Sequence, residues 1–291
     1  MKVDPLCHAA HATMIGVPAP PLACSVRGCG RPLVRRERCY VCPVGHSFDV
    51  ARVGYVNLLQ PDDRRSLAAG DSAKAVDARE RLLAAGAGRA LVDTLIATVS
   101  GLQLPPGAVV VDLGAGTGHH LAAITGAFGL AGIGIDLSTA AASHAARRHP
   151  GLTWVVANAD RRLPLLDASV DLVLSVHARR HPLECARVLA STGTLIVCVP
   201  APDDLAELRA AVQGRAVARD RTADVVAEHA ADFALRDRTT ARQLLPCDRA
   251  ALRDLLAGTY RGERTGQAGA VASLDPLDVT LSSDVLVFAR R

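Results

Sequence analysis

Residues 109–118 read Val109-Val-Val-Asp112-Leu-Gly114-Ala-Gly116-Thr-Gly118, and this stretch decides the fold. A short β-branched run predicts a buried strand, and the alternate glycines after it predict a tight turn into a helix. Because glycines carry no side chains, a ligand can lie against the backbone of the turn, where amides at the helix start offer donors. The stretch therefore predicts a strand, a glycine turn and a helix that bind a ligand together.

Strands and helices alternate on the carboxyl side of Pro105-Pro106-Gly107. Short apolar or β-branched runs predict strands at 108–113, 131–136, 152–156, 170–176 and 194–199, and helices are expected around 118–127, 138–148, 182–190 and 203–212. Such alternation indicates a parallel α/β sheet. We expect residues 277–288 to form a hairpin that closes the sheet with an antiparallel strand. Residues 213–242 are charged and helical in tendency, and residues 71–100 predict two helices broken at 86–88.

Polar residues after successive strands narrow the choice of ligand. The second strand ends in Gly134-Ile135-Asp136, about twenty residues after the glycine turn, where an acid can accept both hydroxyls of a ribose. Contacts to an adenine edge are expected after the third strand, at Asn158-Ala159-Asp160. The glycines alone would also suit a dinucleotide, but Asp112 and this ordered series favour S-adenosylmethionine and a Rossmann-like class I methyltransferase sheet. The predicted cofactor-binding residues are Asp112, Gly114, Ala115, Gly116, Gly118, His119, His120, Asp136, Leu137, Asn158, Ala159 and Asp160.

The segment after the fourth strand is the expected substrate side of the sheet. It reads Ser175-Val176-His177-Ala178-Arg179-Arg180, at the carboxyl edge where open α/β sheets bind their substrates. His177, or water near Asp160, could accept a proton from a substrate nitrogen. A single histidine in a loop also serves as a hydrogen-bonding residue without catalytic function. His177 and Asp160 are therefore the catalytic candidates.

A second motif precedes the sheet and predicts a metal site. Cys24-x4-Cys29 and Cys42-x3-His46 are two pairs separated by twelve residues. Tetrahedral zinc takes four thiolate or imidazole ligands from two short turns. Cys39 competes with Cys42 for a place in the site, but Cys42 has the better spacing to His46. We therefore predict structural zinc at Cys24, Cys29, Cys42 and His46.

Charge is distributed unevenly along the chain. The net charge is +4, and the stretch from Pro20 to Ser66 alone holds eight arginines against four acids. Such a local positive field attracts polyanions, although a solvated arginine-rich face is the alternative. The candidate RNA-binding residues are Arg35, Arg36, Arg38 and Arg52. No apolar run reaches the ~18–20 residues of a membrane span, and no signal peptide is recognisable. We therefore expect a cytoplasmic chain without a membrane partner.

Three strings of the N-terminal part occur in a fixed order, and further strings follow them. They are Cys29-x2-Pro32-Leu33, Tyr40-Val-Cys42-x3-His46-Ser-Phe48-Asp49 and Gly54-Tyr55-Val56-Asn57-Leu58-Leu59, then Gly70-Asp71-Ser72, Ala78-Arg79 and Ala186-Arg187-Val188-Leu189. Together they resemble the RlmA/TlrB family of 23S rRNA (guanine-N1)-methyltransferases, from residue 24 onward. The resemblance implies methyl transfer to N1 of a guanine in a hairpin of domain II of 23S rRNA, a zinc module that helps to bind RNA, and homodimers. In one branch of the family, this modification confers resistance to macrolides such as tylosin.

We therefore expect four segments in the chain. These are a flexible extension at 1–20, a zinc-binding and RNA-binding module at 21–66, a helical linker at 67–104 and an S-adenosylmethionine-dependent methyltransferase domain at 105–291. Two other functions are compatible with these motifs. One is a small-molecule methyltransferase whose zinc module serves folding only. The other is a zinc-bearing RNA-binding protein whose catalytic pocket has decayed.

Overall fold

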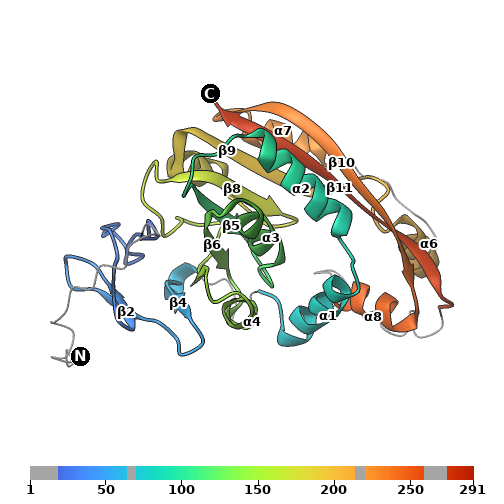
Figure 1. Ribbon diagram of the computed structural model, residues 1–291, viewed down its shortest axis with the longest axis horizontal. Coiled ribbons are helices and arrows are strands. Elements are labelled where there is room, and N and C mark those ends of the chain that lie inside the picture. Colours follow the sequence, from blue (N-terminus) through green and yellow to red (C-terminus); the bar gives the residue numbers. More distant parts are fainter. Residues whose placement is uncertain (1–18, 64–69, 214–219, 259–273) are drawn as a thin grey trace.

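An eight-stranded sheet forms the centre of the molecule (Figure 1). The computed structural model describes residues 19–63, 70–213, 220–258 and 274–291. The strands follow the order β10-β11-β9-β8-β5-β6-β7-β4. Their bounds are β4 Tyr55–Asn57, β5 Val109–Leu113, β6 Ala131–Asp136, β7 Thr153–Val156, β8 Val170–Val176, β9 Leu189–Pro200, β10 Phe233–Cys247 and β11 Leu277–Arg290. The five predicted strands are confirmed as β5 to β9.

The direction of the chain across the sheet reverses at β5. From β5 the chain proceeds to β6 and β7 on one side, and then returns to place β8 and β9 on the other. All neighbouring pairs from β4 to β9 are parallel. An open sheet of this kind binds its ligands outside the carboxyl ends of the strands, beside the reversal. The glycine turn after β5 lies at that point.

Helices cover both faces of the sheet because the side chains of its strands point alternately to either face. Val110 of β5 packs in one apolar cluster with α2 (Arg89–Gly101), α3 (His119–Phe128) and α4 (Thr139–Arg148). The next residue, Val111, packs in a second cluster with α5 (Pro182–Val188) and α7 (Thr222–His229). These buried layers fix the sheet and therefore the positions of its carboxyl ends.

A third apolar cluster joins α1 (Ala73–Ala84), α6 (Ala206–Gln213) and α8 (Arg249–Ala257) to the ends of β10 and β11. Helix α1 begins where the Ser72 side chain accepts the amide of Ala75 at 3.2 Å. The predicted break before α2 is confirmed, with Gly86 and Gly88 at φ of 87° and 79°. Within the described residues no single helix passes as a membrane span, and α1 and α2 pass only as a pair, bent by 79°.

The N-terminal part is joined to the main sheet rather than separated from it. Strands β1 (Val34–Arg36), β2 (Cys39–Val41) and β3 (Ser47–Asp49) form a small antiparallel sheet. The chain then enters the main sheet as β4, parallel to β7. Leu22 bridges to Leu165, and the buried Tyr40 belongs to the same apolar cluster as Val111. Figure 1 shows this part beside β4, at the end of the sheet away from β10.

Two expectations for the C-terminal half were wrong. Residues 233–242 are not helical but form the first part of β10. Of the rest of the expected helical stretch, residues 214–219 lie outside the described ranges, and helix α7 occupies 222–229. Residues 277–288 do not form a hairpin by themselves, because they lie within the single strand β11. The hairpin partner is β10, which pairs with β11 from Phe233↔Arg290 to Cys247↔Leu277. The expected antiparallel strand is present, since β11 pairs antiparallel with β9.

Candidate cofactor and metal sites

The glycine turn between β5 and α3 is packed from three sides. Gly114, Gly116 and Gly118 all have positive φ, at 71°, 56° and 80°. A Cβ added at Gly114 would collide with Ala178, and one at Gly118 would collide with the ring of Trp154. Glycine is therefore required both for the backbone conformation and for the close approach of these neighbours. Gly114 is exposed at the carboxyl end of the sheet, whereas Gly116 and Gly118 are buried beneath their neighbours.

Asp112, the residue before the last one of β5, is fully buried. Its side-chain Oδ1 has no hydrogen-bond partner among the described residues. Burial, and then the charge of Asp136, raise the pKa of Asp112 to about 8. Its carboxyl is therefore mostly protonated at neutral pH, with one polar atom available for a ligand or water. An unpaired buried oxygen beside a glycine turn fits a bound polar molecule.

Asp136 is held against the glycine turn by backbone amides. Its Oδ2 accepts the amide of Gly116 and its Oδ1 accepts the amide of Ser138, each at 2.8 Å. Burial raises the pKa of Asp136, while these two amides act in the opposite direction. Each carboxylate oxygen retains a lone pair for a hydroxyl donor. Asp136, the residue predicted to bind the ribose, therefore lies at the glycine turn. Its carboxylate also has a structural function, because it accepts two backbone amides.

Residues 158–160, which follow β7 after Ala157, lie at the same edge of the sheet, and two of them contact distant segments of the chain. Asn158 donates from Nδ2 to the carbonyl of Asp63 at 2.7 Å, at the end of the short 3₁₀ helix η2 (Pro61–Asp63), and accepts the amide of Asp160 at 2.9 Å. Asp160 forms an ion pair with Arg179, at 3.2 Å. The predicted adenine side of the site is therefore fixed by the segment that follows β4.

Histidines surround the turn in their neutral form. His119 and His120 begin α3 with rings edge to face, 5.6 Å apart. Burial, and then the neighbouring His119, His177 and Arg79, together lower the pKa of His120 to about 3. Burial also lowers the pKa of His119. Neutral rings do not repel a positively charged ligand.

His177 occupies a strained position after β8. Its φ is 52°, which is uncommon for a residue other than glycine. Its amide donates to the carbonyl of Cys198 at 3.0 Å, and its Nε2 lies 2.9 Å from Ser283 Oγ. The residue remains exposed on one side, but the protein atoms packed around the ring, and then Arg79 and Arg221, lower its pKa to about 4. His177 is therefore unprotonated at neutral pH, as a general base must be, but it is a weak base.

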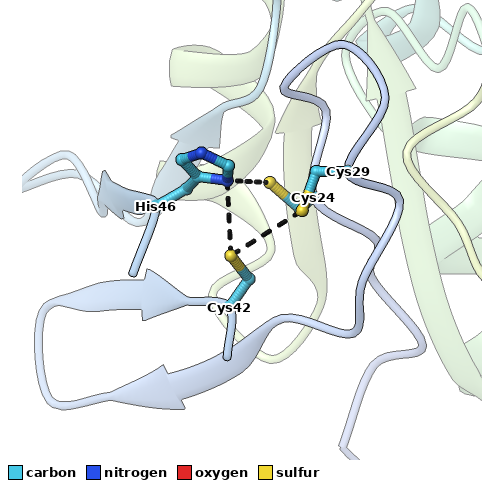
Figure 2. A group of neighbouring side chains, drawn as sticks. All are labelled: Cys24, Cys29, Cys42 and His46. Carbon is cyan, nitrogen blue, oxygen red and sulfur yellow. Dashed lines mark hydrogen bonds between the residues drawn. The ribbon is translucent and has the colours of Figure 1, made fainter. Parts of the chain in front are cut away.

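The four predicted metal ligands come together at the start of the chain. Their ligand atoms all lie within 4.8 Å of one another (Figure 2). Cys24 Sγ and Cys42 Sγ lie 3.3 Å and 3.4 Å from His46 Nδ1, and Cys29 Sγ lies 3.9 Å from Cys42 Sγ. These separations suit the edges of a tetrahedron around zinc with bonds of about 2.0–2.3 Å. Three thiols and one imidazole nitrogen are a fitting donor set for zinc, and Cys39 is not part of the group.

The four candidate RNA-binding arginines are exposed. Arg35 and Arg36 lie on β1, and Arg38 and Arg52 lie in turns of the same N-terminal part. None of them forms an ion pair with another residue in the described part of the chain, and Arg35 stacks over Tyr40 at 5.7 Å. Their charges are therefore available to a polyanion.

Sequence reasoning missed several residues that form this edge of the sheet. Trp154 packs against Gly118 and Gly134, and Arg79 of α1 lies against Gly116. Gly70 packs on Ser138, whose hydroxyl donates to the carbonyl of Asp71 at 2.7 Å. Gly70, Asp71 and Arg79 belong to the strings Gly70-Asp71-Ser72 and Ala78-Arg79, which carried the family resemblance but for which no function was predicted.

The zinc-binding part and the main sheet each match a known protein family. Residues 23–67 match the family model described as RlmA, N-terminal, a zinc ribbon, and residues 110–194 match a methyltransferase domain. A solved structure of a putative methyltransferase from Bacillus halodurans superposes with a TM-score of 0.50 at 14% identity, covering 68% of this chain and 97% of that one. The fold and the two sites define a class I methyltransferase fold with an N-terminal zinc ribbon, and its cofactors are S-adenosylmethionine and zinc.

Curated relatives narrow this class to a family. A 23S rRNA (guanine(748)-N(1))-methyltransferase of Streptomyces fradiae is 42% identical over 184 residues, which are 62% of this chain and 64% of that protein. A putative 23S rRNA (guanine-N(1)-)-methyltransferase of Micromonospora griseorubida is 41% identical over 207 residues, 65% of this chain and 68% of that protein. The matches thus span about two thirds of these relatives. The chain belongs to the family of 23S rRNA (guanine-N1)-methyltransferases.

Proposed function

We propose that the chain transfers the methyl group of S-adenosylmethionine to N1 of a guanine in a hairpin of domain II of 23S rRNA. The observation that carries the proposal is the shared architecture of the two sites. The zinc ribbon presents four exposed arginines, Arg35, Arg36, Arg38 and Arg52, that have no ion pair among the described residues, and it continues through β4 into the sheet that carries the cofactor site. A protein that must hold a structured polyanion near a methyl donor needs these two features in one rigid body.

Methyl transfer from S-adenosylmethionine requires little covalent chemistry from the residues of the chain. When bound, S-adenosylmethionine supplies a methyl group that its sulfonium has already activated. The chain must hold guanine N1 in line with that methyl group and remove the N1 proton. The N1 edge takes part in base pairing, so the guanine must be unpaired or flipped out of its stack. The catalytic candidates are His177, which is neutral, and water beside Asp160.

The proposal also covers the oligomeric state of the protein, its cellular compartment and its physiological role. We expect a homodimer that acts on 23S rRNA in the cytoplasm without a membrane partner. We also expect the modification to lower macrolide susceptibility, as the resemblance implies for one branch of the family. Sedimentation of the purified chain tests the dimer, and the tylosin susceptibility of expressing cells tests the role.

Primer extension tests the reaction itself, because a methyl group on N1 blocks reverse transcription. We expect a stop in domain II on 23S rRNA from cells that express the chain, and none from cells that lack it. Cells expressing Asp136→Ala provide a control with weakened cofactor binding. A chain that binds the cofactor yet leaves no stop in any rRNA would contradict the proposal and favour a small-molecule acceptor.

A further inference from the structure

Arg79 lies over the glycine turn although it belongs to a helix outside the sheet. Its Nη1 is 3.2 Å from the position that a Cβ on Gly116 would occupy. The same nitrogen donates to Asp71 Oδ2 at 2.6 Å, and Nη2 donates to the carbonyl of Gly258 at 3.0 Å. The side chain is about one third exposed, at 32%. The guanidinium is therefore fixed in direction and remains open toward the turn.

The segment before α1 brings Arg79 to this position. Gly70 lies so close to Ser138 that a Cβ would be 2.9 Å from its backbone, and the Ser138 hydroxyl donates to the carbonyl of Asp71. Asp136 is the last residue of β6, and Ser138, two residues later, is the N-cap of α4. The chain is thus fastened beside Asp136, the predicted ribose-binding residue, about two helical turns before Arg79 in α1. A purely structural ion pair would not require this proximity to the glycine turn.

The order of the strands indicates which part of the cofactor reaches Arg79. Asn158 and Asp136 stand at the carboxyl ends of β7 and β6, and the glycine turn follows β5, the next strand in the sheet. With adenine near β7 and ribose near β6, the amino-acid end of the cofactor extends to the turn after β5. That end carries a carboxylate, and a cation lies against the turn. Arg79 also lies near enough to Asp136, His120 and His177 to lower the pKa of each.

We propose that Arg79 binds the carboxylate of the amino-acid end of S-adenosylmethionine. This inference rests on the proposed function only in assuming that cofactor. The planar guanidinium, held by Asp71 and Gly258, provides charge-assisted hydrogen bonds to a carboxylate. Gly116 is a glycine because a side chain there would occupy the space between the guanidinium and the backbone. Arg79 thereby selects the complete cofactor over nucleosides that lack the amino-acid end.

Calorimetry with two nucleosides tests this assignment without turnover. S-adenosylhomocysteine carries the carboxylate, and 5′-methylthioadenosine lacks the whole amino-acid end. We expect Arg79→Gln to weaken S-adenosylhomocysteine binding about ten- to a hundredfold, which is the range for a charge-assisted hydrogen bond. Binding of 5′-methylthioadenosine should stay within about twofold of wild type. Arg79→Lys, which keeps the charge, should recover part of the lost affinity.

Arg81→Gln is the matched control on the same helix. Arg81 forms an ion pair with Asp254 of α8 at 2.6 Å, so its loss also removes a link between α1 and the end of α8. We expect this variant to bind both nucleosides like wild type. An Arg79→Gln variant that loses both nucleosides equally, or retains both while losing only RNA affinity, overturns the inference. A wild-type chain that binds neither nucleoside instead contradicts the cofactor assignment in the proposed function.

Discussion

Single carboxyl groups at the carboxyl edge of the sheet combine binding with structure. Asp112 is buried and mostly protonated, whereas Asp136 receives two backbone amides that close the glycine turn. The sequence predicted both residues as ligands of the cofactor from their positions after strands. It could not predict their protonation or their backbone partners, because those depend on packing between β5, β6 and α1.

Asp112→Asn should stabilise the fold in a pH-dependent manner. The native carboxyl keeps its proton up to a pKa of about 8, while in the unfolded chain its pKa returns to the ordinary aspartate value of 3.8. Between these values the native state binds more protons, so wild-type stability falls as pH rises, by at most about 1.4 kcal/mol per pH unit from this group. Asparagine does not titrate there. Urea unfolding of both proteins at pH 5, 6.5 and 8 should show a difference that grows with pH, and a constant difference would contradict it.

Asp136→Ala should weaken cofactor binding beyond its effect on folding. Loss of the ribose contacts should lower S-adenosylhomocysteine affinity about ten- to a hundredfold in calorimetry. Loss of two amide partners should also lower the free energy of unfolding, by about 1–3 kcal/mol. Asp171→Ala is the matched control, because Asp171 accepts the amide of Val109 at 2.8 Å from the opposite edge of the sheet. That variant should lose stability but retain affinity, and an equal loss of affinity in both would show that Asp136 serves the fold alone.

At the scale of elements, the parallel core was predictable and the edges were not. Strands β5 to β9 each contain a largely apolar run, because both faces of the sheet are covered. β10 is an edge strand whose outer residues are exposed and polar from Arg236 to Thr240, so its sequence has no apolar run that marks a strand. Pairing with β11 overrides its helical tendency. β4 has only three residues, and its partner β7 lies almost one hundred positions further along the chain.

The zinc ribbon should be coupled to the cofactor site through β4. Tyr55 of β4 pairs with Trp154 of β7, and Asn158 is bonded to the carbonyl of Asp63. Replacing Cys42 by Ser and His46 by Ala should remove the metal, expose residues 23–57 to protease and weaken S-adenosylhomocysteine binding. Trp154 is the single tryptophan and packs on the glycine turn, so its emission should change in the same variant.

Cys39→Ser is the control for the zinc prediction. Cys39 is also buried in the ribbon, but it lies outside the ligand group. Elemental analysis should find one zinc per chain in this variant and none in the double variant. Full zinc retention in the double variant would refute the ligand assignment, while unchanged nucleoside affinity after zinc loss would show that the ribbon and the cofactor site are independent.

At the scale of the molecule, exposed charge and the cofactor site lie in different places on one body. Arg35 and Arg36 lie on β1 of the ribbon, and Arg38 lies in the turn after it. The ribbon lies at the β4 end of the main sheet, and β10 and β11 lie at the opposite end (Figure 1). Composition alone predicted the positive stretch. It could not show that these three arginines have no acidic partner among the residues that the structure describes, since acids such as Glu37 and Asp49 lie in the same stretch of the chain.

Replacing Arg35, Arg36 and Arg38 together with Ala should reduce the salt dependence of RNA binding. Arginines that contact phosphates set affinity and register rather than base identity. The slope of log affinity against log salt should therefore fall by about 0.7–0.9 for each lost phosphate contact. S-adenosylhomocysteine binding should remain at the wild-type value, because these side chains lie outside the carboxyl edge of the main sheet. Filter binding of the domain II hairpin between about 50 and 200 mM salt measures the slope.

A second triple variant separates local contact from net charge. Arg89, Arg236 and Arg253 are also exposed and form no ion pair in the described ranges, but they lie on α2, β10 and α8. Replacing them with Ala lowers the net charge by the same amount, three. The slope should stay near the wild-type value, because salt screening limits the action of each charge to about 10 Å at 0.1 M salt. Equal slopes in the two variants would mean that RNA responds to the overall charge of the chain. A slope that falls only in the first variant places the rRNA on the zinc ribbon, where it can reach the methyl donor across β4 and β7.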